Sequence, residues 1–441
     1  MTTRNRLITY TITALLCWGC QEDNLPPQIP VINNVTVTGI TDSTALCTFT
    51  VTITEAIHSV GINYGTDSSQ LTGNISIDDI SGNTFTLPLN NLADDMVYYY
   101  KVYVRDKMFT FIYSEIGEFK TQFSPYGSTF SNGITPARSF RDGDGTQNNP
   151  YLIANAQHLK KLVDDVNGGN ECLQTYFKLM TDIEVTADEW IPIGYGRDYH
   201  IRPCFDGNFD GNGHTISGTL KSDKYRVFGF FGNLDRNARI SNLTIAANVK
   251  NVTGDSNTEG SLTGGIAGNN GGEINNCTNT STVTGGTNTN LVACTGGIAG
   301  SNSNSIINCT VSANGMVIGG GGGANFTGGI AGVNWGGRNG NITNCTNNAT
   351  VSASYSVGGL VGHNDGEIHT SLNTGNITGA DYYGNNFTGG LAGGNYKIDY
   401  TPHLYSCCTN QGTVNGQAAN ANNQIGYGKA VESCPDGHSK R

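Results

Sequence analysis

Apolar and polar residues alternate with a period of two in the first third of the chain. Between Cys47 and Thr54 every second residue is apolar and the residues between them are threonines, and a second alternating stretch runs from Tyr98 to Arg105. Successive side chains of a strand point to opposite faces, so each stretch predicts a strand that is buried on one face. We therefore expect residues 31–122 to form an antiparallel β-sandwich.

The last part of the chain contains one short motif five times, written Thr-Gly-Gly-Ile-Ala-Gly in its first three copies. Its glycine pairs begin at Gly264, Gly296, Gly328, Gly358 and Gly389, which gives a period of 30 to 32 residues. A repeat of this length predicts stacked coils, none of which buries its apolar face alone. Helical periodicity is missing, and glycine allows positive φ or close backbone approach at corners. We expect an all-β chain ending in a right-handed parallel β-helix.

Two columns of equivalent residues are expected to run along this stack. An asparagine follows each glycine pair by six residues, and stacked amides can hydrogen-bond along the stack axis. These asparagines are Asn270, Asn302, Asn334, Asn364 and Asn395. A small residue takes a second slot, at Cys277, Cys309, Cys345, Ser371 and Cys407. We expect mostly reduced cysteines in this core, with Cys407, Cys408 and Cys434 as the exceptions that form disulfides.

A helix is expected to cover the first coil. Apolar residues recur at helical spacing between Ala156 and Val166, and Asn155 can cap the helix. Covering the first coil removes an open strand edge that would invite aggregation. Residues 123–140 are rich in turn-forming steps and predict a linker, so the repeat domain is assigned to residues 141–441.

The N-terminus has the pattern of a targeting segment. Arg4 and Arg6 precede a short apolar stretch that ends in Leu16-Cys-Trp-Gly-Cys20. This segment resembles a bacterial lipoprotein signal, which implies removal of residues 1–19, lipidation of Cys20 and an outer-membrane, lipid-anchored protein exposed at the cell surface. The alternative is an ordinary cleaved secretory signal. Residues 20–30 contain three prolines and predict a stiff linker.

Two further resemblances concern the predicted domains. The unit T-G-G-[IL]-[AV]-G-x-N resembles the GLUG motif of bacterial surface and adhesin-like proteins, which implies a structural repeat. Residues 31–122 resemble a fibronectin type III domain, and Leu92, six residues before Tyr98, fits the tyrosine corner of such sandwiches. The segment departs from that family because it contains no tryptophan.

Composition narrows the classes of function. Only 13% of residues are charged, glycine numbers 61, and the net charge is −11. This profile is typical of an extracellular all-β protein and argues against nucleic acid as a partner. The sequence shows no H-E-x-x-H zinc motif and no G-x-S-x-G nucleophile elbow, so we assign no catalytic residue. Asp142 and Asp144 are weak candidates for a Ca²⁺ loop, and no other cofactor is expected.

Loop insertions in solenoids often lie on the functional face. Two insertions carry aromatic and hydrogen-bonding residues, which are Trp335, Arg338, Tyr396 and Tyr400. We therefore expect a surface adhesin or binding protein for host or dietary glycans or glycoproteins, joined to the membrane through Cys20. Two alternatives stay open: a β-helix polysaccharide lyase or glycoside hydrolase, and a passive structural protein of the cell surface.

Overall fold

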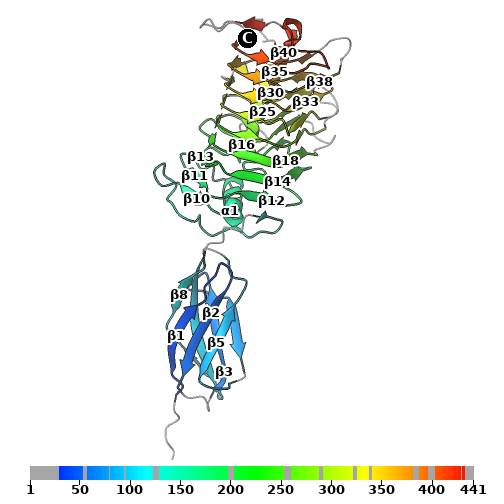
Figure 1. Cartoon of the computed structure of the whole chain (residues 1–441). Helices are drawn as coiled ribbons and strands as arrows, with labels where there is room; N and C mark the ends of the chain where they lie inside the picture. The colour runs from blue at the N-terminus through cyan, green and yellow to red at the C-terminus, as the bar shows by residue number, and fades with distance from the viewer. Residues whose placement is uncertain are drawn as a thin grey trace, which may run out of the picture. The chain divides into compact units, whose positions relative to one another are not determined.

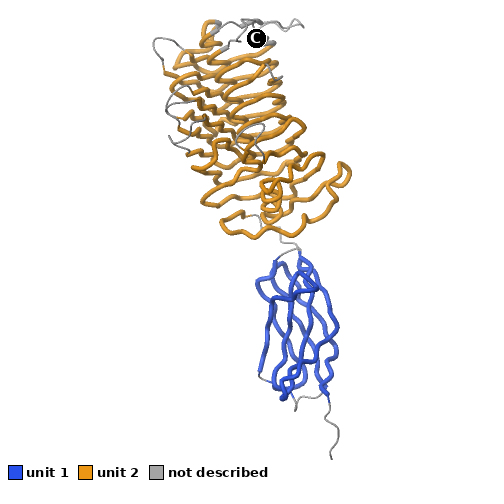
Figure 2. The backbone as a smooth tube through the Cα atoms, turned by 180° about the vertical axis from the view of Figure 1, so that it is seen from behind, with its two compact units in different colours: residues 1–124 blue, residues 125–441 orange. Residues whose placement is uncertain are grey.

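The computed structural model describes residues 29–52, 57–78, 80–93, 96–122, 129–196, 203–252, 260–287, 292–320, 325–336, 340–380, 387–395, 403–428 and 430–432. The chain divides into two compact units, residues 1–124 and residues 125–441 (Figure 2). Within the described ranges the regular structure is almost entirely β, with one α-helix and one short 3-10 helix, Ala421–Asn423. The expectation of an all-β chain is confirmed.

Unit 1 is a sandwich of two antiparallel sheets. Its strands are β1 Ile32–Thr38, β2 Ala45–Val51, β3 Ile57–Gly65, β4 Gly73–Ile77, β5 Thr84–Leu89, β6 Val97–Asp106, β7 Phe111–Tyr113 and β8 Gly117–Lys120. One sheet has the order β1-β2-β5 and the other β4-β3-β6-β7, with β8 also paired to β6. Cys47, Phe49 and Val51 of β2 are buried while the threonines between them face outward, as the alternation predicted.

The hydroxyl of Tyr98 closes the loop before β6. The backbone N–H of Ala93 donates to this hydroxyl at 2.8 Å, so the tyrosine-corner contact predicted for this residue is confirmed. The core around it is built from phenylalanine and tyrosine rings, with Phe119 stacked 5.6 Å from Tyr98. These rings occupy core volume that a tryptophan side chain would otherwise take up.

Unit 2 is a parallel β-solenoid made of four sheets (Figure 1). The ten-stranded sheet contains β10 Tyr151–Ile153, β11 Tyr176–Leu179, β13 Asn208–Asp210, β17 Arg239–Ser241, β21 Glu273–Asn275, β26 Ser305–Ile307, β31 Asn341–Thr343, β36 Glu367–His369, β41 His403–Ser406 and β44 Ala430–Glu432. The six-stranded sheet contains β15 Val227–Phe228, β19 Ser261–Gly264, β24 Ala293–Gly296, β29 Asn325–Gly328, β34 Ser356–Gly358 and β39 Thr388–Gly389.

The other two sheets complete each coil. The seven-stranded sheet contains β16 Phe231–Leu234, β20 Ala267–Asn270, β25 Ala299–Asn302, β30 Ala331–Asn334, β35 Val361–Asn364, β40 Ala392–Asn395 and β43 Ile425–Gly428. The thirteen-stranded sheet contains β9 Thr129–Phe130, β12 Ile183–Val185, β14 Thr215–Ser222, β18 Thr244–Asn251, β22 Thr278–Asn279, β23 Val283–Thr284, β27 Thr310–Val311, β28 Met316–Ile318, β32 Thr346–Asn347, β33 Thr350–Ala353, β37 Leu372–Asn373, β38 Ile377–Gly379 and β42 Thr409–Asn410.

Equivalent apolar residues of successive coils stack inside the solenoid. Ile274, Ile306 and Ile342 occupy one register position of the ten-stranded sheet and are fully buried. Each isoleucine removed from water in this way contributes about 1.5–3 kcal/mol. One coil exposes its apolar face without its neighbours, so the stack is stable only as a whole.

The glycine pairs allow two sheets to approach closely. A Cβ at Gly328 would lie 2.1 Å from the carbonyl oxygen of Ala331 and 2.6 Å from the Cα of Val361 in the next coil. Both atoms belong to the backbone and cannot move aside, so only glycine fits. The paired glycines do not appear among the residues with positive φ. Of the two roles expected for glycine here, close approach is therefore the one that operates.

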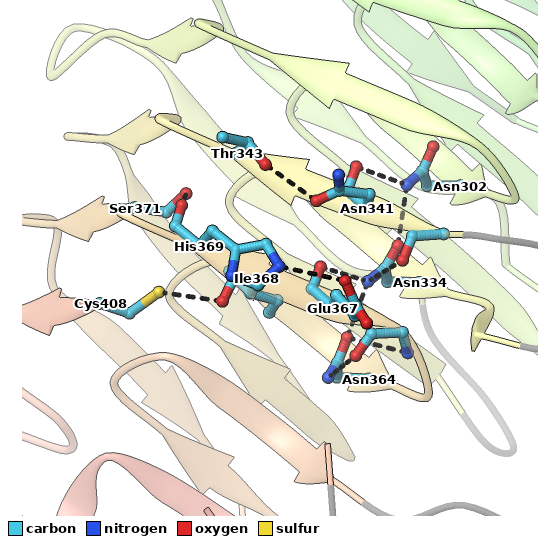
Figure 3. Close-up of polar contacts among 12 residues, drawn as sticks. Asn302, Asn334, Asn341, Thr343, Asn364, Glu367, Ile368, His369, Ser371 and Cys408 are labelled. Carbon is cyan, nitrogen blue, oxygen red and sulfur yellow. Dashed lines mark hydrogen bonds and ion pairs between the residues drawn. The ribbon is translucent and has the colours of Figure 1, made fainter. Parts of the chain in front are cut away.

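The predicted asparagine ladder is present for the four members whose side chains are described. Figure 3 shows Asn302, Asn334 and Asn364 of this ladder. The Nδ2 of Asn270 donates to the Oδ1 of Asn302 at 2.8 Å, and the same bond continues to Asn334 at 2.8 Å and to Asn364 at 2.9 Å. All four side chains are fully buried. A second ladder, which was not predicted, joins Asn347, Asn373 and Asn410 through bonds of 2.7 Å.

The cysteine slot holds free, buried thiols at Cys277, Cys309 and Cys345. Its assignment to Cys407 was wrong. Cys407 has φ +56 and matches the left-handed position of Asn344, whereas Cys408 takes the buried slot and its Sγ donates to the carbonyl of Ile368. Cys407 is disulfide-bonded, as expected, but Cys408 keeps its thiol, and Cys434 lies outside the described residues.

The predicted helix is α1, Ala156–Asn167, at the first coils of the solenoid (Figure 1). The side chain of Asn155 accepts from the backbone N–H of His158 at 2.9 Å, and the predicted apolar face is buried. Part of the segment expected to be a linker belongs to unit 2. Phe130 of β9 is buried there and its ring lies 5.2 Å from the ring of Trp190.

Candidate functional site

Trp335 follows β30 and is 41% exposed. Its indole Nε1 donates to the Oγ of Ser301 at 3.1 Å, which fixes the ring against the neighbouring coil. The ring centre lies 6.2 Å from that of His363. The other residues predicted for ligand binding, Arg338, Tyr396 and Tyr400, lie outside the described residues, as does Cys20.

Trp335 is one member of a continuous row of rings on the solenoid. The row continues from His363 to Phe326 at 5.0 Å, and from Phe326 to Tyr355 at 5.9 Å. Two contacts of 5.1 Å then join Tyr355 to Phe387 and Phe387 to Tyr427, which is 51% exposed. We call these six residues the aromatic row.

Strand register explains why residues so far apart in sequence meet here. His363 and Tyr427 occupy one register column of the seven-stranded sheet, with Gly394 between them. Phe326 and Phe387 each stand directly before a Thr-Gly-Gly, at the start of a strand of the six-stranded sheet. The close glycine packing brings the two columns together, so rings of one column contact rings of the other.

The aromatic row can bind the apolar face of a ligand and still offer polar groups at its edge. Aromatic rings provide large apolar contact areas at low entropy cost, and an exposed indole or phenol adds a polar tip. Of these six residues, the sequence interpretation assigned only Trp335 to ligand binding. The repeated Phe-Thr-Gly-Gly at Phe326 and Phe387 was a signal that could have located two of the rings.

A groove of about 260 Å³ lies on the outward face of the ten-stranded sheet. Its floor is made by side chains from β11, β13, β17 and β21, including Lys178, Asp210 and Arg239. Arg239 donates to Glu273 at 2.7 Å. No hydrogen bond or ion pair within the described part of the chain holds the half-buried Lys178. The groove therefore presents donors and acceptors suited to a polar ligand.

The acids of the groove already have partners within the protein. Asp210 uses one carboxylate oxygen to accept from the backbone of Asn212 and from the side chain of Asn242, both at 2.8 Å. Register places Asp210 and Glu273 two strands and two residues apart, a Cα separation of about 12 Å by strand geometry.

Asp206, the other acid of this region, is buried and has a structural role. Its two carboxylate oxygens accept from the backbone N–H and the side-chain amide of Asn237, at 2.8 and 2.9 Å. Both bonds fix the turn between adjacent coils.

Asp142 and Asp144 lie in the loop that leads to β10. Their carboxylates accept from the backbone N–H groups of Gly143 at 2.7 Å and Thr146 at 3.0 Å. Hydrogen bonds from Thr146 lower the pKa of Asp144. Across the described ranges, no group of three or more histidine, cysteine or acidic residues could hold a metal ion. Calcium at this loop stays a prediction.

Comparisons by sequence are partial, and no family model matches the chain. A protein named as a Gly-rich membrane protein in Evansella cellulosilytica is 31% identical over 158 residues, which cover 34% of this chain and 17% of that protein. Halomucin of Haloquadratum walsbyi is 30% identical over 148 residues, covering 33% of this chain and 2% of that protein. The matches thus span a small part of each relative's length.

The structural similarity of this chain to solved structures is low, as measured by the TM-score. Pectate lyase PelI of Erwinia chrysanthemi, solved with tetragalacturonic acid, is 13% identical, with 91% of this chain and 99% of that chain covered and a TM-score of 0.16. A family 28 exopolygalacturonase of Yersinia enterocolitica is 9% identical, with 85% and 90% covered and a TM-score of 0.18. Structural similarity at this level says nothing about the activity of this chain.

No helix in the described residues is long and apolar enough to cross a membrane.

Proposed function

We propose that the chain is a cell-surface lipoprotein of the adhesin class, which binds glycans or glycoproteins through its β-solenoid. In this proposal a lipid on Cys20 anchors the chain in the outer membrane. Unit 1 acts as a fibronectin type III-like spacer, and a GLUG-type solenoid carries the ligand site. The sandwich of unit 1 and the solenoid of unit 2 are the described parts of this assembly.

The aromatic row is the observation that carries the proposal. It joins four successive coils, from Phe326 of β29 to Tyr427 of β43, a rise of about 14 Å at the usual strand spacing. A surface of this length can contact several sugar rings in sequence, because each ring of a sugar has an apolar face. The exposed Trp335 and Tyr427 mark its two ends.

Two features support the proposed domain types. The sheet order β1-β2-β5 opposite β4-β3-β6-β7, with the Tyr98 corner, is the arrangement expected of a fibronectin type III-like sandwich. The five glycine pairs and the asparagine ladder account for the T-G-G-x-x-G-x-N spacing as structural requirements. The repeated residues therefore have structural roles in the solenoid. The rings of the aromatic row are the residues that we assign to ligand binding.

The groove on the ten-stranded sheet favours a second candidate, a β-helix polysaccharide lyase or glycoside hydrolase. Its Lys178 and Arg239 are cations of the kind that could stabilise an anionic sugar or a proton transfer. The hydrogen bonds that already engage Asp210 and Glu273 weigh against hydrolysis. Binding is thus the better-supported function.

The test uses residues 21–441, which include every residue that the structure describes. The protein is incubated with a panel of immobilised host and dietary glycans and glycoproteins, and retention and released product are measured in the same wells. We expect retention without product. Released product would identify the enzyme, with Lys178→Ala as the first variant to examine. Neither retention nor product on the whole panel would contradict the adhesin and favour a passive structural protein.

A further inference from the structure

Exposed apolar side chains gather at the hairpin between β6 and β7 in unit 1. Met108 is 81% exposed, Phe109 57% and Phe111 45%. We call these three residues the tip cluster. Large apolar side chains left in water together cost free energy that a folded domain usually avoids, so a contiguous group of them marks an interaction surface.

The hairpin turn is rigid. One carboxylate oxygen of Asp106 accepts from the backbone N–H groups of Met108 at 2.9 Å and Thr110 at 2.8 Å. Backbone bonds from Phe109 to Asp106 and from Asp106 to Thr110 close the same turn. The tip cluster is therefore held in place before any partner arrives, which lowers the entropy cost of binding.

The backbone at Phe109 is unsuited to phenylalanine. Its φ of +66° lies in the left-handed region, which favours glycine and asparagine. In the described ranges, thirteen residues other than glycine have positive φ. Eight of them are asparagines, and Phe109 is the only aromatic residue among them. Folding alone would select asparagine at this position. An exposed ring kept at the cost of backbone strain points to a function in contact.

Basic groups surround the tip cluster. The guanidinium of Arg105 lies 4.4 Å from the ring centre of Phe109 and 5.5 Å from that of Phe111. Lys107 is exposed at the start of the turn. An apolar tip flanked by two basic residues is suited to the boundary between acyl chains and lipid head groups, where long basic side chains reach the phosphates.

The tip cluster lies at the end of the sandwich where the chain enters it. Ile57 pairs with Asp106, and Ile32 pairs with Val51. Only five residues join Val51 to Ile57, so both pairs must lie at one end of the sandwich. Residues 1–28 leave from this end, next to Ile29, which is 71% exposed.

We propose that this end of unit 1 rests on a lipid bilayer, with Met108 and Phe109 inserted at the acyl boundary and Arg105 and Lys107 among the head groups. The placement rests on the proposed lipid at Cys20. Eight residues, 21–28, separate Cys20 from Ile29, a reach of at most about 30 Å. A tether of this length keeps the tip at high local concentration near the bilayer, which adds to the affinity that the tip has for the bilayer by itself.

The test measures bilayer binding without the anchor. Residues 21–441 lack both the apolar stretch before Cys20 and the lipid, so only the folded chain can bind. The protein is floated with vesicles of phosphatidylcholine, alone or mixed with phosphatidylglycerol. We expect flotation with both, and at least about tenfold weaker partitioning for Met108→Ser combined with Phe109→Asn, because two apolar side chains then lose their burial in the bilayer.

Two controls make the result specific. Asparagine suits the left-handed backbone at position 109, so Phe109→Asn removes the ring without unfolding the turn. Leu46→Ser removes another exposed apolar side chain, 41% exposed on β2 near the opposite end of the sandwich, and should not change partitioning. Failure of the wild-type chain to float, or equal flotation of the double variant, would overturn the proposal. Glycan retention is measured without vesicles, so the two proposals fail separately.

Discussion

Removing one amide from the asparagine ladder should loosen the coils on either side of it. The informative change is Asn334→Ala. In the folded chain the Oδ1 of Asn334 accepts from Asn302 at 2.8 Å, and its Nδ2 donates to Asn364 at 2.9 Å. Neither neighbour has access to water, because all three side chains are fully buried. The substitution therefore breaks both ladder bonds, which solvent cannot replace, and also removes the longer bonds from Nδ2 to the carbonyls of Gly340 and Glu367.

The expected cost follows from what the neighbours keep. The Nδ2 of Asn302 retains the carbonyl of Asn304 at 2.9 Å, and the Oδ1 of Asn364 retains a long contact of 3.4 Å from the backbone of Gly366. A buried polar group left unsatisfied costs about 1–3 kcal/mol, and each lost bond about 0.5–1.5 kcal/mol. We expect a total loss of about 2–4 kcal/mol.

Hydrogen exchange detects this loss locally, which matters because stacked coils do not unfold as one two-state domain. Amides of β30 and β35 should lose protection by about 30- to 700-fold, since each 1.4 kcal/mol is a factor of ten. The matched control is Asn341→Ala, whose half-buried side chain accepts only from Thr343 at 2.8 Å (Figure 3). It should cost about 0.5 kcal/mol or less. Equal loss of protection in both variants would refute the ladder as a source of stability.

Two further predictions concern the same core. Burial raises the pKa of Cys309 and Cys345 well above the ordinary value, so both stay neutral thiols at pH 8. Both should therefore resist iodoacetamide until urea unfolds the solenoid. Labelling of either cysteine in the native protein, detected by mass spectrometry, would contradict this. Gly328→Ala should destabilise unit 2 by about 1–3 kcal/mol or more, because its Cβ meets backbone atoms of Ala331 and Val361, and an unchanged midpoint of urea unfolding would show that the sheets can separate there.

The features repeated along the sequence could be predicted because each coil uses the same local geometry. The glycine pairs required close backbone approach, and the asparagines six residues later required an amide ladder, so their spacing indicated the stack directly. The helix after Asn155 could be predicted for the same reason, because helix capping and the spacing of apolar residues depend only on nearby residues in the sequence. Cys407 was misplaced because the extra residues before it shift the slot to Cys408, and the sequence does not show where an insertion is absorbed.

The candidate sites depend on contacts between coils, which the sequence does not specify. Phe326 and Tyr355 are 29 residues apart, and their contact depends on loop lengths that vary from coil to coil. The groove combines Lys178 and Glu273 from different coils, with no shared motif. The tip cluster is local, but alternation alone predicts strand ends and not the left-handed backbone at Phe109.

The most direct test of the central claim is equilibrium binding to the ligand that the panel retains, compared between variants of residues 21–441. The account predicts that Trp335→Ala combined with Tyr427→Ala weakens binding by at least about tenfold, because exposed aromatic anchors each contribute on the order of 1 kcal/mol or more. Tyr195→Ala, which removes a 38% exposed ring of unit 2 outside the aromatic row, should bind as the wild type does. Unchanged affinity in the double variant, or an equal loss in the control, would contradict the aromatic row as the binding surface.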